Sequence, residues 1–209
     1  HMDPDVTNAL PQDIPAKRLY DKMGDIFPSK EFVFVGITGD SLFTPQNIGT
    51  IAALTDSIDA YPEVYNVISP TNISLIEGTE DGMVVRDILK DLPETPEEIR
   101  QYRQDLFHSD LALGNIISKD EQAAGIMIFL KNTVDPDDFV SAFIMSLERM
   151  DQQSDLDYLL AGKPVVNHYV SLGMQRDMAV FFGGGLAVIF VLLLIAFRSI
   201  RGIILPLTV

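Results

Sequence analysis

The hydrophobic and polar positions along this 209-residue chain predict two units of alternating strand and helix, followed by a long apolar segment. The first unit begins with EFVFVGIT, residues 31–38, a short run rich in β-branched and aromatic residues that is typical of a buried strand. Apolar residues then recur at helical spacing after Thr44, which can cap a helix, and Pro45, which suits the first helical position. The run VYNVIS, residues 64–69, predicts the second strand.

The same order of elements recurs in the second half of the chain. Residues 124–132, AGIMIFLKN, predict a strand, and Asp135 and Pro136 begin an amphipathic helix. Residues 157–162, DYLLAG, predict the last strand. Two consecutive β-α-β units predict an α+β domain of the ferredoxin-like, split β-α-β type, with an antiparallel sheet and both helices on one face.

A helical insertion, residues 70–123, separates the two units. It contains a capping box that starts at Thr95 and predicts a helix through about His108. Residues 113–120, LGNIISKD, predict a hairpin strand that pairs with residues 124–132.

The N-terminal segment is expected to be less regular. His1 and Met2 are typical of residues left after removal of an expression tag, and they are excluded from the fold. Residues 3–30 contain four prolines and predict a loosely structured lead-in with one short helix around 16–23. The folded domain is therefore expected to span residues 31–163.

The segment from Met178 to Phe197 contains twenty consecutive residues without a charge. As a helix it would span about 30 Å, which is the hydrocarbon thickness of a bilayer. A buried helix of a soluble domain would usually be shorter and would have a polar face. Because Pro164 can open a helix that continues into this segment, one helix is expected over residues 164–197, with a transmembrane span at 178–197.

Two arginines follow the span directly. Arg198 and Arg201 mark the cytoplasmic side, because positive charge is enriched in cytoplasmic loops. The preceding domain is then expected on the periplasmic or extracellular side of the cell (inner) membrane. The sequence becomes apolar again from Gly202, so residues 198–209 predict a cytoplasmic turn and the truncated start of the next span.

Charge and residue types argue against several functions. Fifteen basic and thirty acidic residues give a net charge of −15, which repels phosphate backbones and makes nucleic acid an unexpected partner. Cysteine is absent, which excludes thiol chemistry. His108 and His168 lie 60 residues apart in different predicted elements, and no nucleophile with a base accompanies either. Neither enzymatic activity nor a cofactor is expected.

A metal site is not expected either. Asp135, Asp137 and Asp138 resemble a cation site in composition, but carboxylates at a helix N-terminus are explained by the helix macrodipole. The methionines are explained as filler of the core and of the membrane span.

Several segments resemble the resistance-nodulation-division (RND) superfamily of transporters, in particular its MMPL-type and hydrophobe-amphiphile exporter branch. Residues 40–69 resemble the first helix and second strand of a porter subdomain, and residues 114–130 resemble its later hairpin. LAGKPVV is similar to the junction between the last strand and the second membrane helix, with Gly162 and Pro164 as its motif residues. FRSIRGIILP is similar to the loop between the second and third membrane helices; its motif residues are Phe197, Arg198, Ser199, Arg201, Gly202 and Pro206.

This resemblance implies proton-driven export of hydrophobic or amphiphilic molecules, often lipids. The chain would be the first extracytoplasmic porter loop plus transmembrane helix 2. Its partners would be the remaining transmembrane helices and second porter domain of the same transporter, membrane lipid and the substrate, and a homo-oligomer is compatible with the resemblance. The proton-relay residues would lie in later helices, and no motif here marks substrate-binding residues. The helix from Pro164 would couple membrane movement to the domain, with Gly173 and the glycines at 183–185 as candidate flex points.

Two alternatives explain part of the pattern. A ligand-sensing extracytoplasmic domain of a membrane-anchored receptor accounts for the acidic domain and one span, but not for the apolar residues after Gly202. An RND-like accessory subunit of protein translocation would share the whole architecture. Bound lipid would favour the exporter, and binding of unfolded polypeptide would favour the translocation subunit.

Overall fold

The computed structural model describes residues 11, 13–26, 29, 31–79, 82–151 and 155–197 of the chain. The chain divides into two compact units. One runs from Asp5 to His168 and contains both sheets, and the other includes Tyr169 to Phe197 of the described residues.

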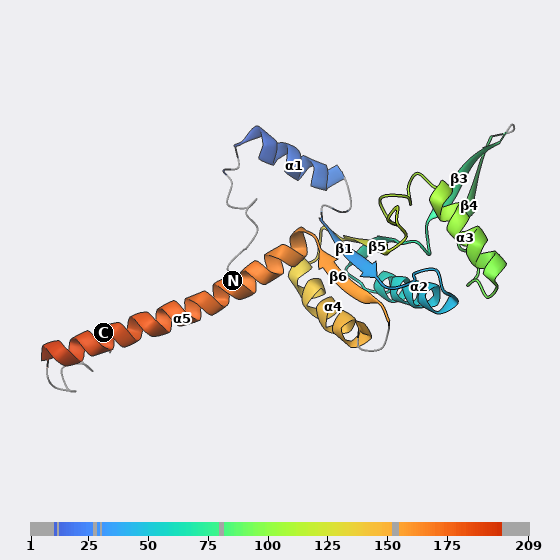
Figure 1. The fold of residues 1–209 in the computed structure, drawn as a ribbon. Coiled ribbons are helices and arrows are strands. Elements are labelled where there is room, and N and C mark those ends of the chain that lie inside the picture. The colour runs from blue at the N-terminus through green and yellow to red at the C-terminus, as the bar shows by residue number, and fades with distance from the viewer. Residues whose placement is uncertain are drawn as a thin grey trace. The chain divides into compact units, whose positions relative to one another are not determined.

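The main sheet of the first unit has four strands in the order β2-β5-β1-β6, and every neighbouring pair is antiparallel (Figure 1). The strands β1 and β2 are therefore parallel to each other with β5 between them, and β5 and β6 are parallel with β1 between them. The bounds are β1 Glu31–Thr38, β2 Val64–Ile68, β5 Ala123–Leu130 and β6 Asp157–Ala161.

One helix connects each parallel pair of strands. Helix α2, Pro45–Asp59, joins β1 to β2, and helix α4, Pro136–Asp151, joins β5 to β6. The Thr44 hydroxyl accepts a hydrogen bond from the backbone N–H of Asn47 at 3.1 Å, which confirms the predicted cap of α2. Figure 1 shows α2 and α4 on the same side of the sheet. The chain therefore has the predicted α+β class and the split β-α-β order.

The core lies between these two helices and one face of the sheet. Every second residue of β1, namely Val33, Val35 and Ile37, is fully buried, because successive side chains of a strand point to opposite faces. From α4, the rings of Phe139 and Phe143 stack with centroids 5.3 Å apart. The Tyr61 ring meets both rings edge-on, which is a favourable aromatic geometry.

The insertion between the two β-α-β units, residues 70–123, contains a hairpin that sequence reasoning missed. Strands β3, Ser74–Thr79, and β4, Gly82–Asp87, form a separate two-stranded sheet. Helix α3, Pro96–His108, follows and begins with the predicted capping box, in which Thr95 and Glu98 bond reciprocally. The backbone N–H groups of Thr95 and Glu94 donate to the Glu98 carboxylate and lower its pKa.

Residues 113–120 do not form the predicted strand, but the predicted antiparallel pairing with β5 is present as a single bridge between Ile117 and Ala124. This segment is a compact turn in which the carbonyl of Ala112 accepts hydrogen bonds from the backbone N–H groups of Ile116 and Ile117. Gly114 adopts a positive φ of 82°, which breaks an extended strand. The turn still meets β5, since Gly125 N–H donates to the carbonyl of Ile116 at 2.7 Å.

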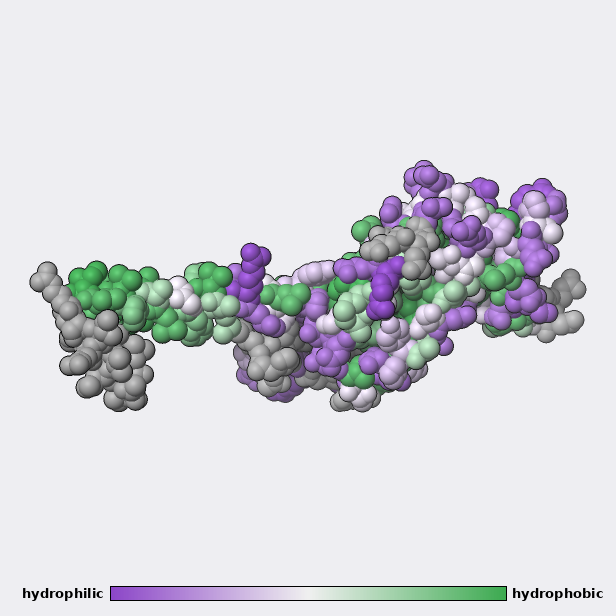
Figure 2. All heavy atoms as spheres, turned by 90° about the horizontal axis from the view of Figure 1, so that it is seen from below, coloured by the Kyte–Doolittle hydropathy of each residue, from purple (hydrophilic) through white to green (hydrophobic). Residues whose placement is uncertain are grey.

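The two remaining helices lie at the ends of the described chain. Helix α1, Pro15–Ile26, contains the short helix predicted in the lead-in. Helix α5 is a single helix of 35 residues, Lys163–Phe197. Residues 163–195 contain a stretch with a mean hydropathy of 2.8, none of it buried within the molecule, so α5 is long and apolar enough to cross a membrane. Figure 2 shows apolar side chains along this helix.

Candidate functional site

The junction between β6 and α5 is built on Gly162. This residue has a φ of +125°, a region that side-chain-bearing residues rarely adopt. A Cβ atom at this position would lie 2.6 Å from the carbonyl oxygen of Phe32 on β1. The chain therefore needs glycine here for both backbone conformation and close approach. The carbonyl of Gly162 then accepts from the N–H of Val166 at 3.1 Å, which begins α5.

Pro164 occupies the second position of α5 and is buried in the domain, next to the buried Val165. A proline in the first turn does not interrupt the helix, because the N–H groups of that turn have no partner within the helix. The two motif residues of the junction thus have distinct structural roles: Gly162 turns the chain, and Pro164 starts the helix.

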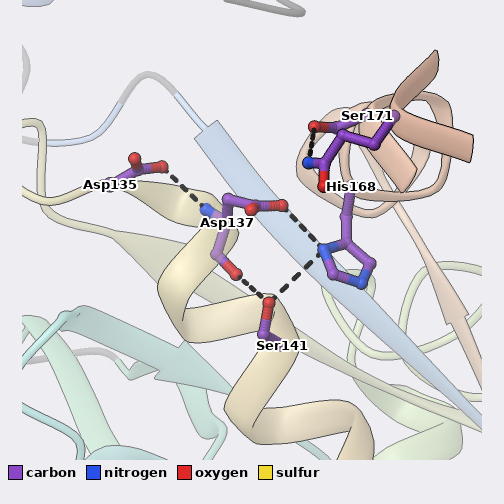
Figure 3. Close-up of polar contacts among 6 residues, drawn as sticks. Asp135, Asp137, Ser141, His168 and Ser171 are labelled. Carbon is purple, nitrogen blue, oxygen red and sulfur yellow. Dashed lines mark hydrogen bonds and ion pairs between the residues drawn. The ribbon is translucent and has the colours of Figure 1, made fainter. Parts of the chain in front are cut away.

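One ion pair and one histidine–carboxylate hydrogen bond attach the first two turns of α5 to neighbouring elements of the domain. The Lys163 ammonium lies 2.7 Å from Oε1 of Glu31, the first residue of β1. One and a half turns later, Nδ1 of His168 lies 2.7 Å from Oδ1 of Asp137 in the first turn of α4 (Figure 3). The Glu31 and His168 side chains are largely buried, with exposed fractions of 17% and 11%. The base of α5 is therefore fixed to both β1 and α4.

Sequence reasoning did not find these pairs. It assigned no catalytic role to His168, and it explained Asp137 as a carboxylate favoured by the helix macrodipole. The pairing joins residues 31 positions apart, and nothing in the spacing of charges along the chain indicates it. Of the three aspartates near the start of α4, Asp137 contacts the histidine, whereas Asp135 accepts the backbone N–H of Asp137 at 3.0 Å (Figure 3).

The face of the main sheet opposite the core helices carries a second candidate surface. Phe32 pairs with Phe129 across β1 and β5, and their ring centroids are 6.3 Å apart. Phe34 pairs with Met127 in the same row, and Leu159 of β6 lies opposite Gly36. Phe32 is 46% exposed and Leu159 is 65% exposed. We call Phe32, Phe34, Met127, Phe129 and Leu159 the apolar sheet face.

The root of the β3–β4 hairpin is tied to α3 by a charged network. Nη1 of Arg86 lies 2.8 Å from Oδ2 of Asp105, and the amide of Gln101 donates to the other carboxylate oxygen at 2.9 Å. The hydrogen bond from Arg86 is the main cause that lowers the pKa of the Asp105 carboxyl. Burial raises the pKa of the neighbouring Tyr102 hydroxyl, which donates to the carbonyl of Pro70. The contacts of Asp105 and of Tyr102 have a structural role in the insertion.

Among the residues that the structure describes, no group of three or more histidine, cysteine, aspartate or glutamate side chains could hold a metal ion. The loop motif predicted after α5 lies almost entirely outside the described residues. Phe197 is the last residue of α5, and Arg198, Ser199, Arg201, Gly202 and Pro206 lie outside the described residues.

The α+β domain continues directly into a helix that is long and apolar enough to cross a membrane. The profile of the MMPL family, a family of transporters, matches residues 8–209, which is nearly the whole chain. The chain therefore belongs to the MMPL family. No curated protein matches the sequence significantly.

Proposed function

We propose that this chain is the first extracytoplasmic porter domain, with the membrane helix that follows it, of a proton-driven RND-type exporter of hydrophobic or amphiphilic molecules, lipids among them. The observation that carries the proposal is the continuity of α5. One helix begins at the Gly162 junction of the domain and continues through a membrane-length apolar segment. Membership of the MMPL family supports transport as the general activity.

The attachment of α5 supports a mechanical role for the domain. Because Gly162, Lys163 and His168 hold the first two turns of the helix against β1 and α4, these turns would move together with the sheet. A shift of the membrane span along its axis would then be transmitted to the domain, since a helix resists compression and stretching. The energy source would be proton flow through helices elsewhere in the transporter.

The apolar sheet face supports the proposed substrate class. Exposed aromatic and aliphatic side chains on a sheet can hold an apolar molecule without hydrogen bonds that select one head group. The remaining membrane helices and a second porter domain of the same transporter would complete the path. The arginines at 198 and 201 support an orientation with this domain on the periplasmic or extracellular side of the inner membrane.

The proposal is tested with the full-length transporter in proteoliposomes that carry a fluorescent phospholipid and an imposed pH gradient. A Ser171→Pro variant interrupts α5 between the domain and the span, and Ser171→Ala is the matched control because it leaves the helix intact. We expect at least about a tenfold loss of gradient-dependent lipid export for the proline variant, and export within about twofold of the parent for the alanine variant.

Two results would contradict the proposal. Equal export by both variants would show that α5 does not couple the span to the domain. Absence of export by the parent protein, together with binding of unfolded polypeptide, would favour the translocation subunit instead.

A further inference from the structure

The hydrogen-bonding surroundings of His168 determine where its ring carries a proton. Nδ1 faces two oxygen atoms of α4: Oδ1 of Asp137 at 2.7 Å and Oγ of Ser141 at 3.4 Å (Figure 3). The carboxylate can only accept a hydrogen bond. The Ser141 hydroxyl donates its own proton to the backbone carbonyl of Asp137 at 2.7 Å, so its oxygen is also an acceptor toward the ring. Nδ1 must therefore be the protonated nitrogen.

This arrangement leaves Nε2 as the nitrogen at which the ring gains or loses its second proton. When Nε2 is protonated the ring is a cation, and the contact with Asp137 is an ion pair as well as a hydrogen bond. When Nε2 loses its proton, a neutral ring donates to the carboxylate and the Coulombic attraction is lost. Histidine is the side chain whose ordinary titration lies between about pH 5 and pH 8.

The other charged groups nearby favour one direction of the effect. On α4, Asp138 is exposed in the same turn as Asp137, and the carboxylate of Asp135 is engaged with the N–H of Asp137. On α5, the nearest basic residue toward the N-terminus is Lys163, which is paired with Glu31 of β1. The surroundings are thus acidic, so the protonated ring is the state that binds α4 more tightly.

We propose that His168 and Asp137 form a proton-dependent clamp that holds the second turn of α5 against the N-terminus of α4. At acidic pH the clamp is tight, and α5 moves with the sheet from Gly162 through His168. At alkaline pH the clamp weakens, and the Lys163–Glu31 pair and the Gly162 junction remain as the attachment. His168 is the C-terminal residue of the compact unit, so the clamp acts where the helix leaves it.

The clamp rests on the contacts of His168, Asp137 and Ser141 and does not require the proposed function. Its consequence for export does rest on that function: an acidic exterior would strengthen the coupling of α5 to the domain. The experiments below use the intact 209-residue chain in detergent micelles and measure the clamp alone, so their failure would leave the transport proposal standing.

The first experiment locates the ring protons by nitrogen-15 NMR of labelled histidine at about pH 8. We expect His168 to show a protonated Nδ1 in the parent chain and to shift toward the Nε2-protonated tautomer in Asp137→Ala. Asp138→Ala removes a carboxylate from the same turn and should leave the tautomer unchanged. A predominantly Nε2-protonated His168 in the parent chain would overturn the proposal without any variant having to fold.

The second experiment is a double-mutant cycle of Asp137→Ala and His168→Gln, read by thermal unfolding at about pH 5.5 and pH 8. Glutamine remains neutral at both values. We expect the two substitutions to interact by about 3 °C in Tm at the acidic value and by less than half of that at the alkaline one. The matched cycle with Asp138→Ala should show no interaction. Equal interaction at both pH values, or none at the acidic one, would overturn the clamp.

Discussion

The ring of Phe34 on β1 lies over Gly125 of β5, which is two residues away from the direct cross-strand partner of Phe34. The residue directly opposite Phe34 is Met127, and Gly125 itself faces Gly36. A Cβ atom at Gly125 would meet the ring carbons Cζ and Cε2 far inside van der Waals distance. The absence of a side chain at position 125 therefore allows the aromatic ring to lie flat on the sheet, and it shapes the apolar sheet face.

Replacement of Gly125 by alanine should force the Phe34 ring out of this position. We expect a loss of about 1–3 kcal/mol in the free energy of unfolding, because the core strand is rigid and the ring is wide. Chemical denaturation of the intact chain measures this loss in the free energy of unfolding. Gly49→Ala on α2 is the control: the nearest atom to its added Cβ is 3.9 Å away, so alanine should stabilise the helix by up to about 1 kcal/mol. Equal effects of the two substitutions would contradict the account of Phe34.

Gly162→Ala should be the more damaging glycine substitution. Its Cβ would strike the backbone carbonyl of Phe32, which cannot rotate away as a side chain can, and its φ of +125° is strained for alanine. We expect a loss of about 3 kcal/mol or more in the free energy of unfolding, against the same Gly49→Ala control. A smaller loss in the free energy of unfolding for Gly162→Ala than for Gly125→Ala would show that the junction between β6 and α5 adjusts easily to a side chain.

Asp105 should make the stability of the domain depend on pH in the acidic range. Its pKa is lowered in the folded state, chiefly by the hydrogen bond from Arg86, so it stabilises the fold above its unfolded-state pKa. That contribution is lost as the pH falls through the folded-state pKa. Asp105→Asn should therefore cost about 1–3 kcal/mol at neutral pH and much less at about pH 3. Denaturation at both pH values tests this, with the exposed Asp110→Asn expected to be nearly neutral. A cost for Asp105→Asn that does not change with pH would contradict the role of the ionised carboxylate.

Thr95→Ala should destabilise α3 through loss of the capping box. The threonine hydroxyl accepts from the N–H of Glu98, and the Glu98 carboxylate accepts from the N–H groups of Glu94 and Thr95. We expect a cost of about 1 kcal/mol in the free energy of unfolding. Thr50→Ala in the interior of α2 is a matched control, because its hydroxyl bonds only back to the carbonyl of Gln46 and alanine is the better helix former. If Thr50→Ala lowered the free energy of unfolding and Thr95→Ala did not, the capping box would not be what stabilises α3.

The apolar sheet face should matter for export rather than for folding. Phe32→Ser and Leu159→Ser replace side chains that are about half exposed or more, so each should change the free energy of unfolding by less than about 1 kcal/mol. In the full-length transporter we expect each to reduce export of a fluorescent phospholipid several-fold. Tyr65→Ser, a similarly exposed aromatic on the edge strand β2, should leave export unchanged. Equal loss with all three would indicate a general effect on folding or insertion.

Local patterns along the chain were sufficient for the α+β class, for the capped helices α2 and α3, and for the apolar helix α5. In each of these, neighbours within a few residues decide the conformation: Thr44 and Thr95 cap with N–H groups three positions ahead, and the apolar residues from Met178 to Phe197 are contiguous. Repetition of the β-α-β pattern also predicted the split order of the strands, because short connections limit the topologies that a sheet can adopt.

The hairpin β3–β4 and the turn at residues 113–120 needed the tertiary structure. Ile116 and Ile117 are buried as strand residues would be, yet the positive φ of Gly114 and the carbonyl of Ala112 fold the segment into a turn. The hairpin strand β4 has exposed residues on both faces, so it lacks the alternation by which a strand is recognised.

Only the tertiary structure brought His168 to Asp137, Lys163 to Glu31 and the Phe34 ring to Gly125. Each contact joins elements that are distant along the chain, and a side chain pointing out of a helix has the same local pattern whether or not a partner approaches it. The amino-acid sequence thus specifies which elements form and which of them is apolar enough for a membrane, because those properties depend on neighbouring residues. The residues that fasten the membrane helix to the domain are specified by the packing of the sheet against α4, a long-range property that no local pattern contains.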